Sequence, residues 1–153
     1  MKGKGFRFRA QAALDLRQRE HDAARRVLAK AEADLREAGR VLHEATQCAD
    51  EARAQCAARM QEPGGHVQAQ WYRSWILRLD RERALAANAV TSRQAQVAEA
   101  TAACTRSRQR VESLERFKEK ASQEWERQAL AEEQKHIDAL ATMRFTTSSR
   151  AER

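Results

Sequence analysis

The sequence has little that ends a helix and little large apolar side-chain volume. Its 153 residues include one proline and five glycines. Leucine, isoleucine, valine and phenylalanine together make up roughly 15% of the chain, which by itself is typical of disordered proteins, because so little apolar surface offsets the entropy of folding. A globular enzyme with a large packed core is therefore excluded.

Cysteine pairs and long apolar runs are also missing. Cys48, Cys56 and Cys104 are odd in number and form no CxxC or similar pair, so we expect neither a disulfide framework nor a structural zinc site, and a reducing cytosol fits best. The N-terminus has a basic start but no unbroken apolar region. No stretch approaches the ~18 to 20 apolar residues of a membrane span. The sequence predicts a cytoplasmic protein or one bound peripherally to a membrane.

What the chain does contain favours long helices. Alanine supplies about half of the 42% of residues that are hydrophobic, and Ala, Glu, Lys, Leu and Arg together exceed about half of the sequence. This composition is typical of coiled coils. The 29 basic and 22 acidic residues, a formal net charge of +7, are mixed along the chain.

The segment EPGG at residues 62–65 is the one strong turn signal. Proline cannot continue a helix, and glycine takes left-handed conformations freely, so the chain is expected to turn over residues 62–66. The apolar periodicity on either side is helical. It predicts a first helix over about 8–61 and a second over about 67–143.

Seven-residue repeats in the first helix predict one side of a coiled-coil seam. The a row of this helix begins with leucines and ends with smaller residues, and its d row contains alanine alone. The two rows are Leu28, Leu35, Leu42, Ala49 and Cys56, and Ala24, Ala31, Ala38, Ala45 and Ala52. Small d residues let a partner helix approach closely, and Val27 and Val41 are expected to widen the seam at g.

The second helix carries a matching pair of rows. They are Ile76, Val90, Val97, Cys104, Val111 and Trp125, and Leu79, Ala86, Ala100, Leu114 and Ala121. Polar residues interrupt them at Arg83, Arg93, Ser107 and Lys118, so this side of the seam should be the weaker one.

A turn of about four residues requires the two helices to run antiparallel. We therefore predict an all-α protein, a long antiparallel two-helix coiled coil (helical hairpin) in a single domain over residues 1–145. With the pivot at Gly64, residue i lies opposite roughly residue 128 − i, which places Leu14 near Leu114. Residues 146–153 are predicted to form a disordered tail.

The second helix is predicted to be longer than the first, so residues after about 122 have no partner within the chain. Apolar residues on such an overhang usually contact a binding partner. Those residues are Trp125, Leu130, Ile137, Leu140 and Phe145.

No group of residues predicts an active site, a metal centre or a cofactor site. The four histidines are spread along the chain without an HExxH pattern, and His21 falls on the a row, where we expect a tolerated core residue. Glu112, Glu115 and Glu119 lie beside basic residues on one helix, which is typical of a solvated face. We expect a protein that is not an enzyme and needs no cofactor.

Aromatic residues gather just after the turn, in a chain with only 5% aromatic content. Trp71 and Trp75 lie one helical turn apart beside the seam rows, and Ile76 and Leu79 lie on them. Tryptophan and tyrosine dominate binding hot spots because they bury a large area at small entropic cost. The alternative is that these rings pack into the core against Met60 and Cys56.

The basic N-terminus carries Phe6 and Phe8 between cations, a pattern that can neutralise phosphates and stack bases. This leaves a nucleic-acid-binding coiled coil as an alternative. Elsewhere, however, arginine is mixed with glutamate and forms no basic run. Phe6 and Phe8 can also cap the open end of the hairpin near residues 120–122. The four cations are Lys2, Lys4, Arg7 and Arg9.

Both ends of the chain resemble the flagellar FliJ family. The matching residues are Phe6-Arg7-Phe8, Leu14-Asp15-Leu16-Arg17 and Glu20 to Ala24 near the start, and Leu114-Glu115, Trp125, Gln134-Lys135, Asp138 and Arg144-Phe145 near the end. With the helix–turn–helix pattern between them, the resemblance covers nearly the whole chain. The sequence departs from the family pattern at Ala10, where leucine is frequent, and at Ala139, where an acidic residue is common.

This resemblance implies a component of the flagellar type III export apparatus with a fold similar to the stalk subunit of rotary ATPases. It implies a protein that binds and stimulates a FliI-like export ATPase hexamer, couples it to the cytoplasmic domain of a FlhA-like export gate, and escorts export chaperones. Such a protein serves flagellum assembly and motility. It would lie in the cytoplasm, peripheral on the cytoplasmic face of the cell membrane at the flagellar base.

By position, the segment that meets the gate in that family holds Trp71, Trp75 and Leu79 here. We assign binding of the ATPase ring to the overhang and the aromatic N-terminus. The ring-binding residues expected are Phe6, Phe8, Trp125, Ile137, Leu140 and Phe145. An injectisome stalk protein is the near alternative, and the nucleic-acid-binding coiled coil is the alternative from another class.

Overall fold

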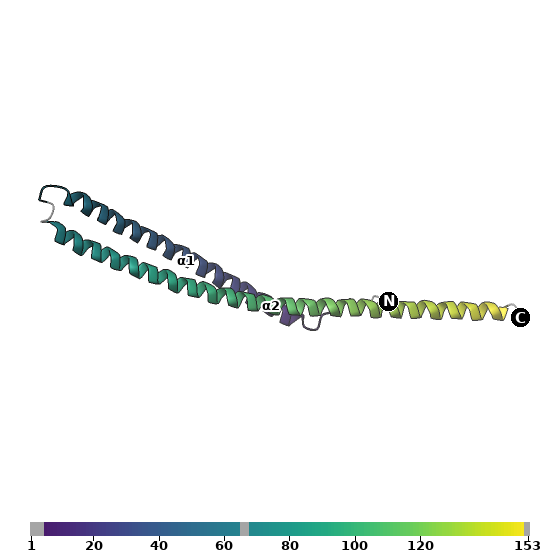
Figure 1. The fold of residues 1–153 in the computed structure, drawn as a ribbon. Coiled ribbons are helices and arrows are strands. Elements are labelled where there is room, and N and C mark those ends of the chain that lie inside the picture. Colours follow the sequence, from purple (N-terminus) through teal and green to yellow (C-terminus); the bar gives the residue numbers. More distant parts are fainter. Residues whose placement is uncertain (1–4, 65–67, 152–153) are drawn as a thin grey trace. The chain divides into compact units, whose positions relative to one another are not determined.

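The computed structural model describes residues 5–64 and 68–151, with side chains described as far as residue 144. It consists of two long helices, α1 (Gln11–Met60) and α2 (Ala69–Ala151) (Figure 1). Neither helix contains proline, and Gly39 is the one glycine within them, so their sequences hold no strong helix breaker. The all-α helical hairpin predicted from the sequence is confirmed.

Helix α1 begins at Gln11, slightly later than the residue 8 predicted. A turn precedes it, in which the backbone N–H of Gln11 donates to the carbonyl oxygen of Phe8 at 3.2 Å. Phe8 is buried while still outside the helix. Helical periodicity does not reveal this loop, because its packing depends on contacts with a distant part of α2.

The reversal between the helices lies where the sequence predicts it. Two backbone hydrogen bonds close the end of α1, from the N–H of Gln61 and that of Glu62. Gly64 has a φ of +82°, in the left-handed region that glycine adopts without strain. Residues 65 and 66 of the predicted turn lie outside the described residues.

Helix α2 continues to Ala151, whereas the sequence analysis placed its end near residue 143 and a disordered tail from residue 146. That expectation rested on the position of the segment at the end of the chain, where disorder is common. No proline or glycine follows Gly65, however, so nothing in the local sequence stops the helix. Residues 152 and 153 of the predicted tail lie outside the described residues.

The contacts divide the chain into two compact units, and each pairs a part of α1 with a part of α2. One is Met1–Arg19 with Arg108–Arg153, and the other is Glu20–Ser107. The sequence analysis predicted a single hairpin domain. In a two-helix coil each residue contacts only its neighbours along the axis and on the facing helix, so the contacts form local blocks and not one central core.

Within the unit Glu20–Ser107 the two helices are antiparallel and in the predicted register (Figure 1). His21 Nδ1 lies 3.0 Å from Ser107 Oγ, and Asp34 forms an ion pair with Arg93 at 3.8 Å. The residue numbers of these pairs sum to 128 and 127, against the 128 expected.

The a and d rows predicted from the sequence are the covered rows in this unit. Ala49 and Ala52 have 0% exposed surface, and every other a or d residue from His21 to Cys56 is half-buried. Val27, by contrast, is 61% exposed and Val41 is 43% exposed, so the predicted widening of the seam at g is wrong. The covered surface is therefore limited to the a and d rows, and Val27 and Val41 lie outside it.

We predict that Ala52→Leu destabilises the protein by about 1–3 kcal/mol, because a larger side chain overpacks a seam without free space. Urea denaturation would measure this loss. Ala54→Leu is the matched control, since Ala54 is exposed on the same helix. Equal shifts for the two variants would contradict the register.

The polar residues that interrupt the α2 seam in this unit all have partners. Arg83 reaches Asp80 at 3.6 Å, Arg93 pairs with Asp34, and Ser107 contacts His21. His21 is therefore a half-buried seam residue with a polar partner. The interruptions cost the seam apolar area but leave none of these three polar groups unsatisfied.

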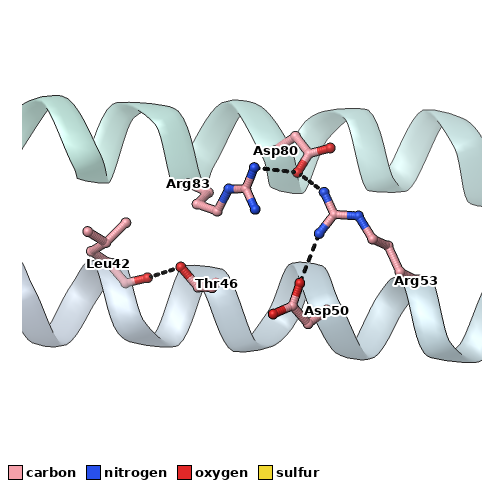
Figure 2. Close-up of polar contacts among 6 residues, drawn as sticks. All are labelled: Leu42, Thr46, Asp50, Arg53, Asp80 and Arg83. Carbon is pink, nitrogen blue, oxygen red and sulfur yellow. Dashed lines mark hydrogen bonds and ion pairs between the residues drawn. The ribbon is translucent and has the colours of Figure 1, made fainter.

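A cross-helix ion cluster holds the turn-proximal end of the unit, as Figure 2 shows. The Arg53 guanidinium of α1 donates to Asp80 of α2 and, at 3.0 Å, to Asp50 one turn earlier on its own helix. The hydrogen bond to Asp80, more than the charges of Asp80 and Asp50, raises the pKa of Arg53. The cluster lies at the surface, so it adds little stability.

The unit that joins Met1–Arg19 to Arg108–Arg153 has a small core of its own. Phe8 (7% exposed), Leu14 (3%) and Val111 (8%) are buried together, and Leu114 packs against them, close to Leu14 as predicted. Further residues packed against this core are Phe6, Ala10 and Ala121.

Candidate functional site

The first candidate surface is the aromatic cluster, formed by Trp71, Tyr72 and Trp75 in the first turns of α2. The ring centroids of Trp71 and Tyr72 lie 5.1 Å apart and nearly perpendicular, at 83°. Those of Trp71 and Trp75 lie 5.4 Å apart, and those of Tyr72 and Trp75 lie 6.0 Å apart. These are favourable aromatic geometries, so the three rings form one connected group.

The three rings differ in burial. Trp71 is 62% exposed, whereas Tyr72 and Trp75 are half-buried. Tyr72 lies seven residues before Leu79 and therefore on the d row, a seam position that the sequence analysis did not assign to it. Tyr72 anchors the cluster to the seam, and the Trp71 indole is its most exposed part.

Leu79 is half-buried on the seam as predicted, so it supports this surface more than it forms it. Leu85, which the sequence analysis did not single out, is exposed and shares its heptad position with Trp71. The sequence could have revealed this residue, because Leu85 lies two heptads after Trp71. Trp71 and Leu85 are therefore two separate exposed apolar side chains on α2, with the exposed Arg78 at the same heptad position between them.

The second candidate surface is the overhang, residues 123–144 of α2, in which every residue is exposed. Three large aliphatic residues there form the overhang stripe: Leu130 (66% exposed), Ile137 (53%) and Leu140 (59%). Leu130 and Ile137 are one heptad apart, and Leu140 is one turn further on, so the three share one side of the helix.

The overhang stripe does not continue the seam of the hairpin. Beyond Trp125 the a and d positions are small or polar, namely Gln128, Glu132, Lys135, Ala139 and Thr142. The stripe occupies the f and b positions, which lie on the opposite side of a coiled-coil helix. Pairing with α1 therefore could not bury the stripe even if α1 were longer.

The overhang is helical without a packed face because its own side chains support it. Lys135 pairs with Glu132 at 2.9 Å, and Gln134 donates to Asp138 at 2.9 Å. Such contacts at i, i+3 and i, i+4 each stabilise a helix slightly. The hydrogen bond from Lys135 lowers the pKa of Glu132. Its exposed apolar residues are therefore not needed to hold the helix together.

The N-terminal aromatics lie in different surroundings. Phe6 lies against Trp125, with ring centroids 6.3 Å apart, so Trp125 is not unpartnered as the sequence analysis expected. The ring centroids of Phe8 and Phe117 lie 5.6 Å apart, and Phe8 belongs to the core. Phe8 therefore caps the end of the hairpin and is not part of the exposed surface. The side chain of Phe145 lies outside those described.

Within residues 5–64 and 68–151, no three His, Cys, Asp or Glu side chains come together as metal ligands. The three cysteines are free thiols. No helix in the same ranges combines the length and the apolar character needed to cross a bilayer.

A comparison with protein families connects this geometry to a cellular system. The family described as flagellar FliJ protein matches residues 7–150. No curated protein and no solved structure matches the chain.

Proposed function

Because the chain belongs to the FliJ family, whose members act in flagellar type III export, we propose that it is the non-enzymatic stalk of the export ATPase. It binds the ATPase ring, stimulates ATP hydrolysis, and couples the ring to the export gate. It also escorts export chaperones. In this role it lies in the cytoplasm, on the cytoplasmic face of the cell membrane at the flagellar base.

The observation that carries the proposal is the overhang stripe. Leu130, Ile137 and Leu140 are exposed on a helix that is held by its own ion pairs, and they face away from the seam. A ring of ATPase subunits could surround such a helix and contact all its sides. We assign ring contacts to the stripe, to Phe145, and to Phe6 with Trp125, but not to the buried Phe8.

The aromatic cluster is the proposed contact with the gate. Trp71 and Trp75 provide a large apolar area on a fixed helix, which is the composition of a binding hot spot. Leu79 supports them from the seam. No active site is needed for this role, since the hydrolysis belongs to the ATPase.

The packing of the N-terminus weakens the nucleic-acid alternative. Phe8 is buried against Phe117 and cannot stack on a base, and Phe6 is half-buried beside Trp125, so only part of its ring is exposed. The match to a flagellar family supports the flagellar system over the injectisome. The direct test is whether the full chain binds the export ATPase and raises its hydrolysis rate. No binding and no stimulation would contradict the stalk.

For the gate contact we predict that Trp71→Ala weakens binding to the gate's cytoplasmic domain about thirtyfold, the effect of losing ~2 kcal/mol at a hot spot. Because Trp71 is 62% exposed, its removal should change the thermal stability little. Trp75→Ala should lower both affinity and stability, since Trp75 is half-buried. Calorimetric titration and thermal denaturation measure the two quantities.

Leu77→Ala is the control for this experiment, because Leu77 is an exposed apolar residue of the same turns outside the aromatic cluster. Its affinity for the gate should stay close to that of the unchanged chain. If Trp71→Ala binds as tightly as Leu77→Ala, the gate contact lies elsewhere.

A further inference from the structure

Lys118 is the exception among the polar residues that interrupt the α2 seam. The other three reach Asp80, Asp34 or His21, as described above. Lys118 is half-buried on the a row, but the structure gives its ammonium group no partner among the described residues 5–64 and 68–151. No described side-chain nitrogen or oxygen is both buried and without a hydrogen-bond partner, so the Lys118 ammonium reaches solvent while its stem packs in the seam, and it is available to a ligand.

The surroundings of Lys118 add positive charge. Lys118 lines a hollow of about 800 Å³ between α2 and the N-terminal loop, the basic hollow, whose other charged lining residues are Arg7 and Arg9. None of the described residues that line it is acidic. The remaining lining residues are Phe6, Phe8, Gln11 and Ala12.

The loop holds these cations in place. Phe8 is fixed in the core beside Leu14 and Val111, and Arg7 and Arg9 are its immediate neighbours in the sequence. Arg7 and Arg9 are exposed, whereas Phe8 is buried and Phe6 is half-buried. The loop therefore has an apolar side that packs on the protein and a basic side that faces solvent. The backbone that carries the two arginines is therefore fixed before any ligand arrives, which lowers the entropy cost of binding.

The start of α1 strengthens the field. Gln11 is the first residue of α1 and lines the basic hollow, and the first turn of the helix contains no acidic residue. The N-terminal end of a helix carries partial positive charge. Three cations and a helix terminus thus line one hollow, and the Asp15 carboxylate, which accepts a hydrogen bond from Gln11 at 2.8 Å, is not among the residues that line it.

We propose that the basic hollow binds a phosphate group, carried by a small polyphosphate or by an anionic lipid headgroup. Arginine forks and a lysine ammonium match phosphate oxygens in geometry and charge. The inference goes beyond the proposed function, since neither the ring contact nor the gate contact uses Lys118. A nucleic acid is disfavoured, because the adjacent rings pack within the protein.

The test is calorimetric titration of the full chain with inorganic pyrophosphate at constant ionic strength. Arg7→Gln, Arg9→Gln and Lys118→Gln should each weaken binding about tenfold or more, the effect of losing one charge-assisted hydrogen bond. Arg26→Gln and Arg106→Gln are matched controls, with the same charge change at exposed positions of the other unit. These controls should bind as the unchanged chain does.

A second arm identifies the source of the phosphate. Vesicles of phosphatidylcholine, with and without phosphatidic acid, are tested with the same variants. Binding that requires phosphatidic acid and is lost in Arg9→Gln assigns the site to a lipid headgroup, whereas pyrophosphate binding with no vesicle binding assigns it to a free ligand.

Three results would overturn the proposal. One is no binding of either probe. Another is equal weakening in the hollow variants and the controls, which would reflect net charge alone. The third is binding of a single-stranded oligonucleotide but neither probe, which would make the hollow part of a nucleic-acid interface. Circular dichroism of each variant checks that a loss of binding is not a loss of fold.

Discussion

A chain ending at Gln128 should stay folded but fail to stimulate the export ATPase. It keeps Trp125 against Phe6 and the core around Leu14, so both units retain their packing. It lacks Leu130, Ile137 and Leu140, the exposed stripe that we assign to the ring. The stimulated rate should therefore fall to the rate of the ATPase alone. A cut after Lys120 would be less informative, because it would also remove the partner of Phe6.

Point variants separate loss of the stripe from loss of helix length. Ile137→Asp with Leu140→Asp should also abolish stimulation, because charges replace the apolar contact. Val27→Asp with Val41→Asp, an equal change at exposed positions outside the overhang, should leave stimulation intact. Steady-state ATP hydrolysis measures each case. Undiminished stimulation by the shortened chain would mean that the ring contacts another part of the molecule.

Phe8→Ala should be the most destabilising single change in the unit that contains both termini. Phe8 is 7% exposed and packs with Leu14 and Val111, so its truncation leaves a cavity and costs about 3–5 kcal/mol. The expected result is rapid amide exchange in the first turns of α1, which the core around Phe8 holds against α2. Hydrogen-exchange mass spectrometry measures this.

Phe117→Ala is the matched control, because its ring faces that of Phe8 but is 57% exposed. It deletes the same atoms and should cost much less, since a large part of the ring already contacts water. Similar exchange in the two variants would mean that Phe8 is not a core residue.

Much of the fold could be predicted because spacing alone decides it. The a and d residues from His21 to Cys56 are covered as their heptads require, and one turn at Gly64 fixes the pairing of His21 with Ser107. The start of α1 could not be predicted in this way. The burial of Phe8 outside the helix depends on Leu14 and Val111, and no local pattern encodes that contact.

The exposure of the flanking valines was also beyond the sequence analysis. Val27 and Val41 have the pattern of a wider seam, but the structure leaves both exposed while the a and d residues beside them are covered. At the candidate site, the cluster of Trp71 and Trp75 was visible as a local excess of aromatic residues. That Trp71 is the exposed ring follows only from the structure, and the assignment to flagellar export rests on the family match.

The single reversal at Gly64 also shapes how the hairpin forms. Arg53 and Asp80 are 27 residues apart in sequence, whereas His21 and Ser107 are 86 apart. Forming the distant pair first would close a larger loop, at an extra entropic cost of about 1 kcal/mol from chain length alone. Pairing near the turn shortens the loop for every later pair. Folding of this unit should therefore proceed like a zipper from the turn, with the ion cluster of Arg53 as an early link and the histidine pair as a late one.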